Sequence, residues 1–230
     1  MSTRLARNAG WAAYVSGIAA ILGMVSLILF FALEAPQATG THFWGPVSDI
    51  CPIVQMVSLL VVARAFYLMQ RSSVPRLSLI AGAVGIAGML GVALLQLLLI
   101  AKVIPFEQEV GPVVLATGVV GVWLILVNNL GRRQGSLPSR LAWMGIAVGA
   151  AFVLEPVMLS APGGAVAWRV FMSNYLLLTG SAVVFLVAYV GFPVWAIWLG
   201  RVFLATNVTA QKVATGQPSQ ADDIQAVLIG

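Results

Sequence analysis

Residues 78–101 read SLIAGAVGIAGMLGVALLQLLLIA, an apolar run of 24 residues that contains no charged side chain. A helix rises about 1.5 Å per residue, and a bilayer core about 30 Å thick needs roughly 20 apolar residues to cross it. The run is therefore long enough to be a membrane-spanning helix. A membrane β-strand would instead alternate apolar and polar residues over about ten positions, which this run does not do.

Five further apolar runs lie on either side of this one, at about residues 11–33, 47–69, 112–130, 139–160 and 173–203. The chain has 230 residues, of which 60% are hydrophobic and 8% charged. A soluble domain carries about 25% charged residues, so water cannot be the main solvent of this surface. We predict an all-α transmembrane bundle of six helices in residues 1–204, followed by a polar tail in residues 205–230.

The basic residues give the predicted bundle an orientation. Ten of the twelve fall at one set of helix ends, and only Lys102 and Arg169 fall at the other. Lysine and arginine gather on the cytoplasmic side of membrane proteins, so we expect both termini and the tail to be cytoplasmic. The outer loops are then expected near residues 34–46, 102–111 and 160–172. The same distribution explains the net charge of +5 without a nucleic-acid partner.

Prolines and small residues predict how the helices begin, bend and pack. The second span is expected to begin at Pro46-Val47 and the fourth at Gly111-Pro112. Gly191-Phe192-Pro193 should kink the long sixth run, because proline cannot donate a backbone hydrogen bond in mid-helix. Small residues four positions apart, such as Gly145 and Gly149, let two helices approach closely.

Two stretches at the predicted cytoplasmic ends are similar. Residues 76–85 read RLSLIAGAVG and residues 140–149 read RLAWMGIAVG, and Arg4-Leu5 stands in the same place before the first span. One interpretation is a chain of three helical hairpins in the same orientation. The other is that inner ends are simply rich in arginine and spans rich in small residues.

The carboxylates inside or beside the spans gather at the outer face in this topology. Asp49 and Glu155 are the most deeply placed, each about a turn inside an outer helix end, and charged groups in a membrane are costly and often functional. One hypothesis is an outward-opening ligand or ion site built from these two carboxylates, with His42 or Arg169 as partner. The alternative is that Asp49 is a first-turn residue favoured by the helix dipole, and that headgroups hydrate Glu155 and His42.

Tryptophans and amides offer other candidates. Trp195 and Trp198 lie beside the predicted Pro193 kink and suggest a groove for a lipid or pigment tail, although residues of an aromatic belt would have the same positions. Gln55 and Gln96 lie well inside their spans, where we expect hydrogen bonds between helices rather than ligand contacts.

No sequence pattern of a catalytic or metal centre is found. The single histidine, His42, and the single cysteine, Cys51, lack the spacing of a zinc, haem or copper site. Neither a phosphate-binding loop nor a Gly-x-Ser-x-Gly elbow occurs. An intramembrane aspartyl enzyme needs two buried aspartates, and the spans offer only Asp49. We therefore expect no enzyme activity, no metal and no cofactor, apart from a bound lipid.

Two runs are similar to those of a known group of proteins. Residues 135–145, GSLPSRLAWMG, and residues 43–49, FWGPVSD, resemble runs in uncharacterised bacterial six-span integral membrane proteins that are classed as a domain of unknown function. The resemblance extends over nearly the whole chain. It implies a multi-pass protein of the bacterial inner (plasma) membrane, and it brings no catalytic residues.

Two functional classes remain after these exclusions. The first is a non-catalytic accessory or structural subunit that packs against other membrane protein subunits or lipids, as the short loops and small-residue surfaces suggest. The second is a small transporter or ligand-binding membrane protein that uses the outer carboxylates Asp49 and Glu155. Because charges at mid-membrane and breaks in mid-helix are mostly lacking in the sequence, the first class is favoured.

Overall fold

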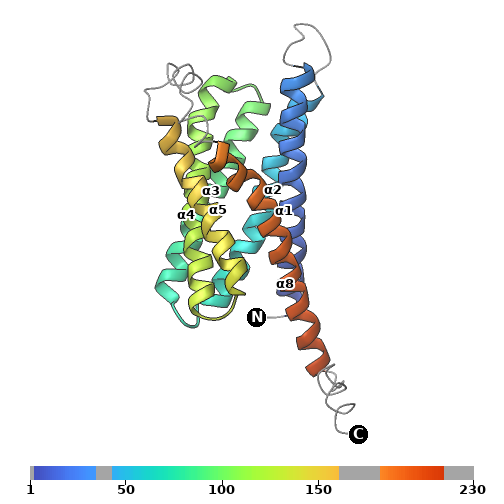
Figure 1. Cartoon of the computed structure of the whole chain (residues 1–230), viewed down its shortest axis with the longest axis vertical. Helices are drawn as coiled ribbons and strands as arrows, with labels where there is room; N and C mark the ends of the chain where they lie inside the picture. Colours follow the sequence, from blue (N-terminus) through green and yellow to red (C-terminus); the bar gives the residue numbers. More distant parts are fainter. Residues whose placement is uncertain (1–2, 35–42, 161–181, 215–230) are drawn as a thin grey trace.

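Six helices that are long and apolar enough to cross a membrane make up the described part of the chain (Figure 1). The computed structural model describes residues 3–34, 43–160 and 182–214, without the side chains of Glu107 and of residues 159–160 and 206–214. The predicted six-helix, all-α bundle is confirmed. Its elements are α1 (Thr3–Leu29) with the π-helical turn η1 (Phe30–Glu34), α2 (Trp44–Gln70), α3 (Pro75–Ile100), α4 (Phe106–Arg133), α5 (Ser139–Ser160), the π-helical turn η2 (Leu186–Val190) and α8 (Gly191–Ala214).

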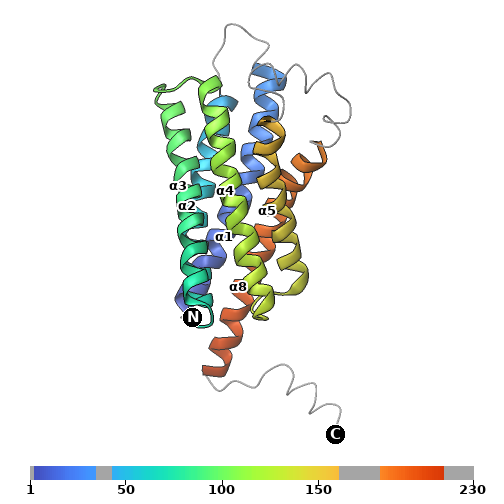
Figure 2. The same ribbon diagram turned by 90° about the vertical axis from the view of Figure 1, so that its left-hand side faces the viewer.

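Helices that follow one another from α1 to α5 pack side by side, and α8 returns to the start of the chain. It crosses the bundle at a tilt, with most of its contacts on α1 and fewer on α5 (Figures 1 and 2). We name the end where α1 begins and α8 ends the basic end, after Arg4, Arg7, Arg71, Arg76, Arg132, Arg133 and Arg140. The opposite end, with Glu34, Asp49 and Glu109, is the acidic end. That the basic end is cytoplasmic stays a prediction.

Glycines set the distances between neighbouring helices. A Cβ atom on Gly121 of α4 would lie 2.6 Å from the carbonyl oxygen of Gly149 on α5, and one on Gly200 of α8 would lie 2.9 Å from the carbonyl oxygen of Gly10 on α1. A Cβ atom on Gly85 of α3 would likewise overlap the Trp123 ring of α4. These small-residue faces therefore meet helices of the same chain, which is how small residues act in membrane bundles.

Helix α2 begins at Trp44, earlier than Pro46-Val47 predicts. The Glu34 carboxylate accepts hydrogen bonds from the backbone N–H groups of Phe43 at 2.7 Å and Trp44 at 2.9 Å. It thereby satisfies donors that have no partner within the helix. The prediction that Asp49 is a first-turn residue is wrong, because the earlier start moves it into the second turn.

Helix α4 also begins earlier than predicted, at Phe106 instead of Gly111-Pro112. Lys102 has a positive φ of 55°, which turns the chain sharply at the end of α3. Pro105 is extended and immediately precedes the first turn of α4. As a result Glu109, expected in an outer loop, lies within a helix and is buried.

The expected break in the last span takes the form of a π-helical turn. Turn η2 ends directly before Gly191, and Pro193 has no N–H to donate to the carbonyl group of Tyr189. Helix α8 then continues to Ala214, which is ten residues past the predicted boundary at residue 204. The rest of the predicted tail, residues 215–230, lies outside the described residues.

The two similar stretches do not have equivalent partners in the bundle. They begin α3 and α5, and both of these helices pack extensively on α4. Helix α5 makes far fewer contacts with α8, its partner in the supposed third hairpin, than α3 makes with α4. The packing therefore gives the three-hairpin interpretation no support beyond the sequence similarity itself.

Candidate functional site

A buried carboxylate and a buried amide are hydrogen-bonded to each other between α3 and α4 near the acidic end, and a second carboxylate on α2 lies within electrostatic range. Nε2 of Gln96 donates a hydrogen bond of 2.9 Å to Oε1 of Glu109, whose side chain is only 2% exposed. Asp49, from α2, is near enough to interact electrostatically with the Glu109 carboxylate. We call this set the Asp49–Gln96–Glu109 cluster.

The register of the helices brings these side chains to one level. Helices α3 and α4 run antiparallel, with Gly88 against Val120 and Gly91 against Ala116. Continuing this register toward the acidic end places Gln96 opposite the first turns of α4, where Glu109 lies. Glu109 was not among the predicted site residues, because the expected outer loop at residues 102–111 includes it. Pro105 is the sequence signal for the early start of α4, because a proline directly before a helix is compatible with a helix that begins at Phe106.

The cluster contains a polar atom that no described residue satisfies. Gln96 is 9% exposed, and its Oε1 atom is buried without a hydrogen-bond partner among the described residues. A buried amide oxygen without a donor loses its hydration and gains nothing in return. The Gln96 oxygen is therefore available to a ligand that seeks an oxygen donor.

Two backbone oxygens next to the carboxylates in the sequence lack their usual helical donors. Pro52 in α2 and Pro112 in α4 lie inside their helices and have no N–H group. The carbonyl groups four residues earlier, those of Ser48 and Gln108, therefore lose the bond that an α-helix normally provides. Each of these residues directly precedes a carboxylate of the cluster in the sequence.

Glu155, the predicted partner of Asp49, belongs to a different group of residues. It is 3% exposed, interacts electrostatically with Tyr189 of η2, and has an Oε1 atom without a hydrogen-bond partner among the described residues. Its neighbour Pro156 packs against Gly118. Gly118 is nine residues, or about 13 Å, further along α4 than Glu109. Glu109 is thus within electrostatic range of Asp49, whereas Glu155 is within electrostatic range of Tyr189.

The remaining predicted members of the site can be placed only in part. His42 and Arg169, proposed as partners of the carboxylates, lie outside the described residues. Within the described ranges, the structure contains no group of three His, Cys, Asp or Glu side chains that is suited to hold a metal ion. The chemistry available in this region is therefore that of two carboxylates, one amide and backbone oxygens.

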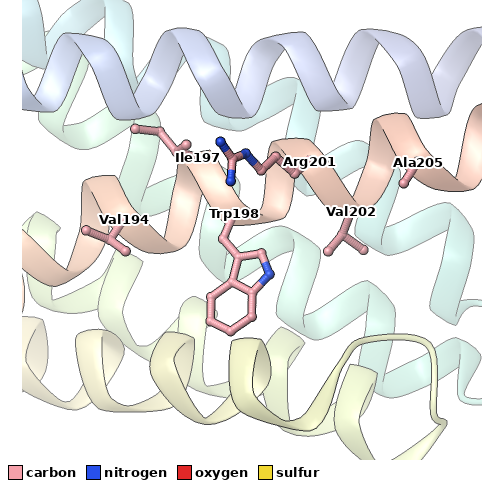
Figure 3. Close-up of a pocket in the computed structure, with 6 residues that line it drawn as sticks. All are labelled: Val194, Ile197, Trp198, Arg201, Val202 and Ala205. Atoms are coloured by element: carbon pink, nitrogen blue, oxygen red, sulfur yellow. The ribbon is translucent and has the colours of Figure 1, made fainter.

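The two tryptophans predicted to share a groove have different surroundings. Trp195 is fully buried, and its Nε1 donates a hydrogen bond of 3.1 Å to Oδ1 of Asn128 on α4. The Asn128 amide lies against Gly145 of α5, where a Cβ atom would collide with it. Trp195 thus connects α8 to α4 in the core, whereas Trp198 lines a groove along α8 (Figure 3).

Comparison with known proteins adds no functional residue. No family model, curated protein or solved structure matches the chain. The resemblance of residues 43–49 and 135–145 to bacterial six-span proteins therefore stays an expectation, and the function is argued from the geometry of the described residues.

Proposed function

We propose that the protein is a small transporter or ligand-binding membrane protein that takes up a proton or a hard monovalent cation at the Asp49–Gln96–Glu109 cluster. The observation that supports this proposal is the contact between Gln96 and a buried Glu109 beside Asp49. Glu109 is buried and Asp49 is half-buried, so both carboxylates lose hydration, and two like charges within electrostatic range repel each other. A bound cation relieves both penalties, because it attracts the two carboxylates and replaces lost water ligands.

The atoms around the cluster favour a hard cation over a transition metal. Carboxylate, amide and backbone carbonyl oxygens are the ligands of hard cations, whereas copper and zinc prefer nitrogen and sulfur. The unsatisfied Gln96 oxygen adds a neutral oxygen ligand to the two carboxylates. Such a set suits Na⁺, and the paired carboxylates alone suit a proton.

An accessory subunit is the other candidate, and the packing gives it less support. The sequence argument for it relied on small-residue surfaces that would contact other proteins. Gly10, Gly121 and Gly149 instead contact helices of this same chain. The outward faces carry large apolar side chains, such as Leu79 and Leu90 of α3, which suit acyl chains as well as a protein partner.

Thermal unfolding of the purified protein in mild detergent tests the proposal. A ligand at a hundred times its dissociation constant stabilises a protein by about 2.7 kcal/mol, so occupancy of the site raises Tm. We expect a saturable rise of Tm on adding NaCl in place of choline chloride, or on lowering the pH, and we expect Glu109→Gln to abolish it. A Tm that responds to neither cation, or that responds equally in Glu109→Gln, would refute the proposal.

A further inference from the structure

A groove with a volume of about 530 Å³ runs along α8 and is lined by Val194, Ile197, Trp198, Arg201, Val202 and Ala205. We call it the α8 groove. Figure 3 shows the helix running between α1 and α5, with the Arg201 guanidinium and the Trp198 indole on opposite sides of its ribbon. All six lining residues belong to α8, so the groove is open toward the surroundings of the bundle.

The groove arises from the uneven packing of α8. On one side glycines bring this helix close to α1, with Gly10 against Gly200 and Gly17 against Pro193. On the other side its contacts with α5 are sparse. Because α8 follows α1 at a tilt, its surface separates from α5 toward the basic end (Figure 1).

One lining residue carries a charge. Arg201 is exposed, and the described residues provide it with no carboxylate partner. Arg132 is different, since its guanidinium lies 4.6 Å from the centroid of the Trp143 ring. The residue before Arg201, Gly200, packs against Gly10 and Tyr14 of α1, which places Arg201 about two turns inside the basic end. A guanidinium at this depth is costly unless an anion accompanies it.

We propose that the α8 groove binds an anionic phospholipid, with its phosphate on Arg201 and an acyl chain along Val194 and Ile197. A guanidinium offers phosphate two parallel hydrogen bonds, which an ammonium group cannot. The order along the groove, with the cation nearer the basic end and the aliphatic side chains nearer the middle, matches that of a lipid in the leaflet at the basic end. Basic side chains near the membrane surface attract anionic headgroups by about 1 kcal/mol each.

This lipid site is independent of the proposed cation cluster. The cluster lies at the acidic end between α2, α3 and α4, whereas the groove lies on α8 toward the basic end. Loss of one site therefore leaves the other intact, and the two proposals fail separately.

Quenching of tryptophan fluorescence by brominated lipids tests the site in reconstituted vesicles. The protein is placed in mixtures of phosphatidylglycerol and phosphatidylcholine, with bromine on one lipid or on the other. The contribution of Trp198 is the difference between the wild type and Trp198→Phe. We expect brominated phosphatidylglycerol to quench this contribution with an association constant about five-fold higher than brominated phosphatidylcholine, as one basic contact implies.

Three variants make the result specific. Arg201→Gln should abolish the preference for phosphatidylglycerol, whereas Arg64→Gln should retain it, because Arg64 is exposed on α2 toward the same end but outside the groove. Val194→Trp fills the apolar part of the groove and should also lower the preference, which keeps the test valid if Arg201→Gln does not fold. Equal quenching by both lipids in the wild type, or a preference that survives Arg201→Gln, would overturn the proposal.

Discussion

Asn128 shows how a single polar side chain links three helices. Its Oδ1 accepts a hydrogen bond from Trp195, its Nδ2 donates to the carbonyl oxygen of Leu124 at 2.8 Å, and its amide rests on Gly145. Asn128, Trp195 and Gly145 are all buried. In the membrane interior such a bond has no competing water, so the amide fixes how α4, α5 and α8 meet.

Asn128→Ala should therefore lower the free energy of unfolding by about 1–3 kcal/mol, because it leaves the Trp195 N–H buried without an acceptor. Unfolding by titration with a denaturing detergent measures the change. Asn129→Ala is the matched control, since Asn129 is half-buried and its side chain accepts a hydrogen bond from Arg132 of its own helix. Equal losses in the two variants would contradict this role of Asn128.

The sequence pointed to some of these residues and not to others. Gln96 was recognised as a possible hydrogen-bonding residue between helices, since it lies well inside an apolar span, and it bonds Glu109 of α4. Glu109 was not recognised, because its burial depends on where α4 begins. Asp49 was recognised as unusual, but its interaction with Glu109 was not predicted. Which side chain lies near Asp49 depends on the register of α2 against α4, and composition does not encode that register.

At the scale of the helices, glycines and prolines decide the contacts and the ends. Glycines at the crossings of α4 with α5 and of α1 with α8 allow backbone atoms to touch. Prolines in the acidic-end halves of α2, α4 and α5 remove helical hydrogen bonds without ending the helices. Sequence analysis found the glycine spacing, but it treated Pro112 as a helix start because proline is common in a first turn.

Gly121→Ala should destabilise the packing of α4 on α5 by about 1–3 kcal/mol, because the added methyl group would overlap the Gly149 carbonyl oxygen. Gly111→Ala is the control on the same helix, since among the described residues no atom outside its chain neighbours and the local helix backbone lies within 4 Å of a Cβ at that position. Thermal unfolding followed by circular dichroism compares the two variants. The account of close packing fails if Gly111→Ala is the more damaging substitution.

Glu34→Ala should loosen the start of α2, because it removes the acceptor for the N–H groups of Phe43, Trp44 and Gly45. Loss of a helix cap costs about 0.5–2 kcal/mol. Hydrogen exchange should accelerate at these three amides and stay unchanged in the middle of α2. Glu34→Gln retains one acceptor oxygen and should have a smaller effect. Unchanged exchange in Glu34→Ala would show that the carboxylate does not cap the helix.

The whole molecule is a bundle whose six apolar helices fit a multi-pass membrane protein. Hydropathy and length were sufficient to predict these helices, because each span must satisfy its own backbone in lipid. The return of α8 to α1 was not predictable, since lipid-facing and helix-facing apolar residues have similar compositions. The separation of positive and negative charges between the two ends was visible in the sequence and agrees with the helix order.

Cysteine labelling in intact cells tests the predicted orientation. In a Cys51→Ala background, a membrane-impermeant maleimide should label Val103→Cys, in the turn between α3 and α4, from outside. Ser73→Cys, between α2 and α3, should be labelled only after the membrane is opened. Labelling of Ser73→Cys in intact cells, with Val103→Cys protected, would reverse the orientation.

The most direct test of the proposed cation site is a double-mutant cycle on cation binding. The cation-dependent rise of Tm is measured for the wild type, Asp49→Asn, Glu109→Gln, the double variant and Glu155→Gln. If Asp49 and Glu109 share one ligand, each single substitution should remove most of the rise and the double substitution should add little, since residues of one site are not additive. Glu155→Gln should retain the full rise. Independent, additive effects at Asp49 and Glu109, or a rise lost in Glu155→Gln and kept in Glu109→Gln, would contradict the account.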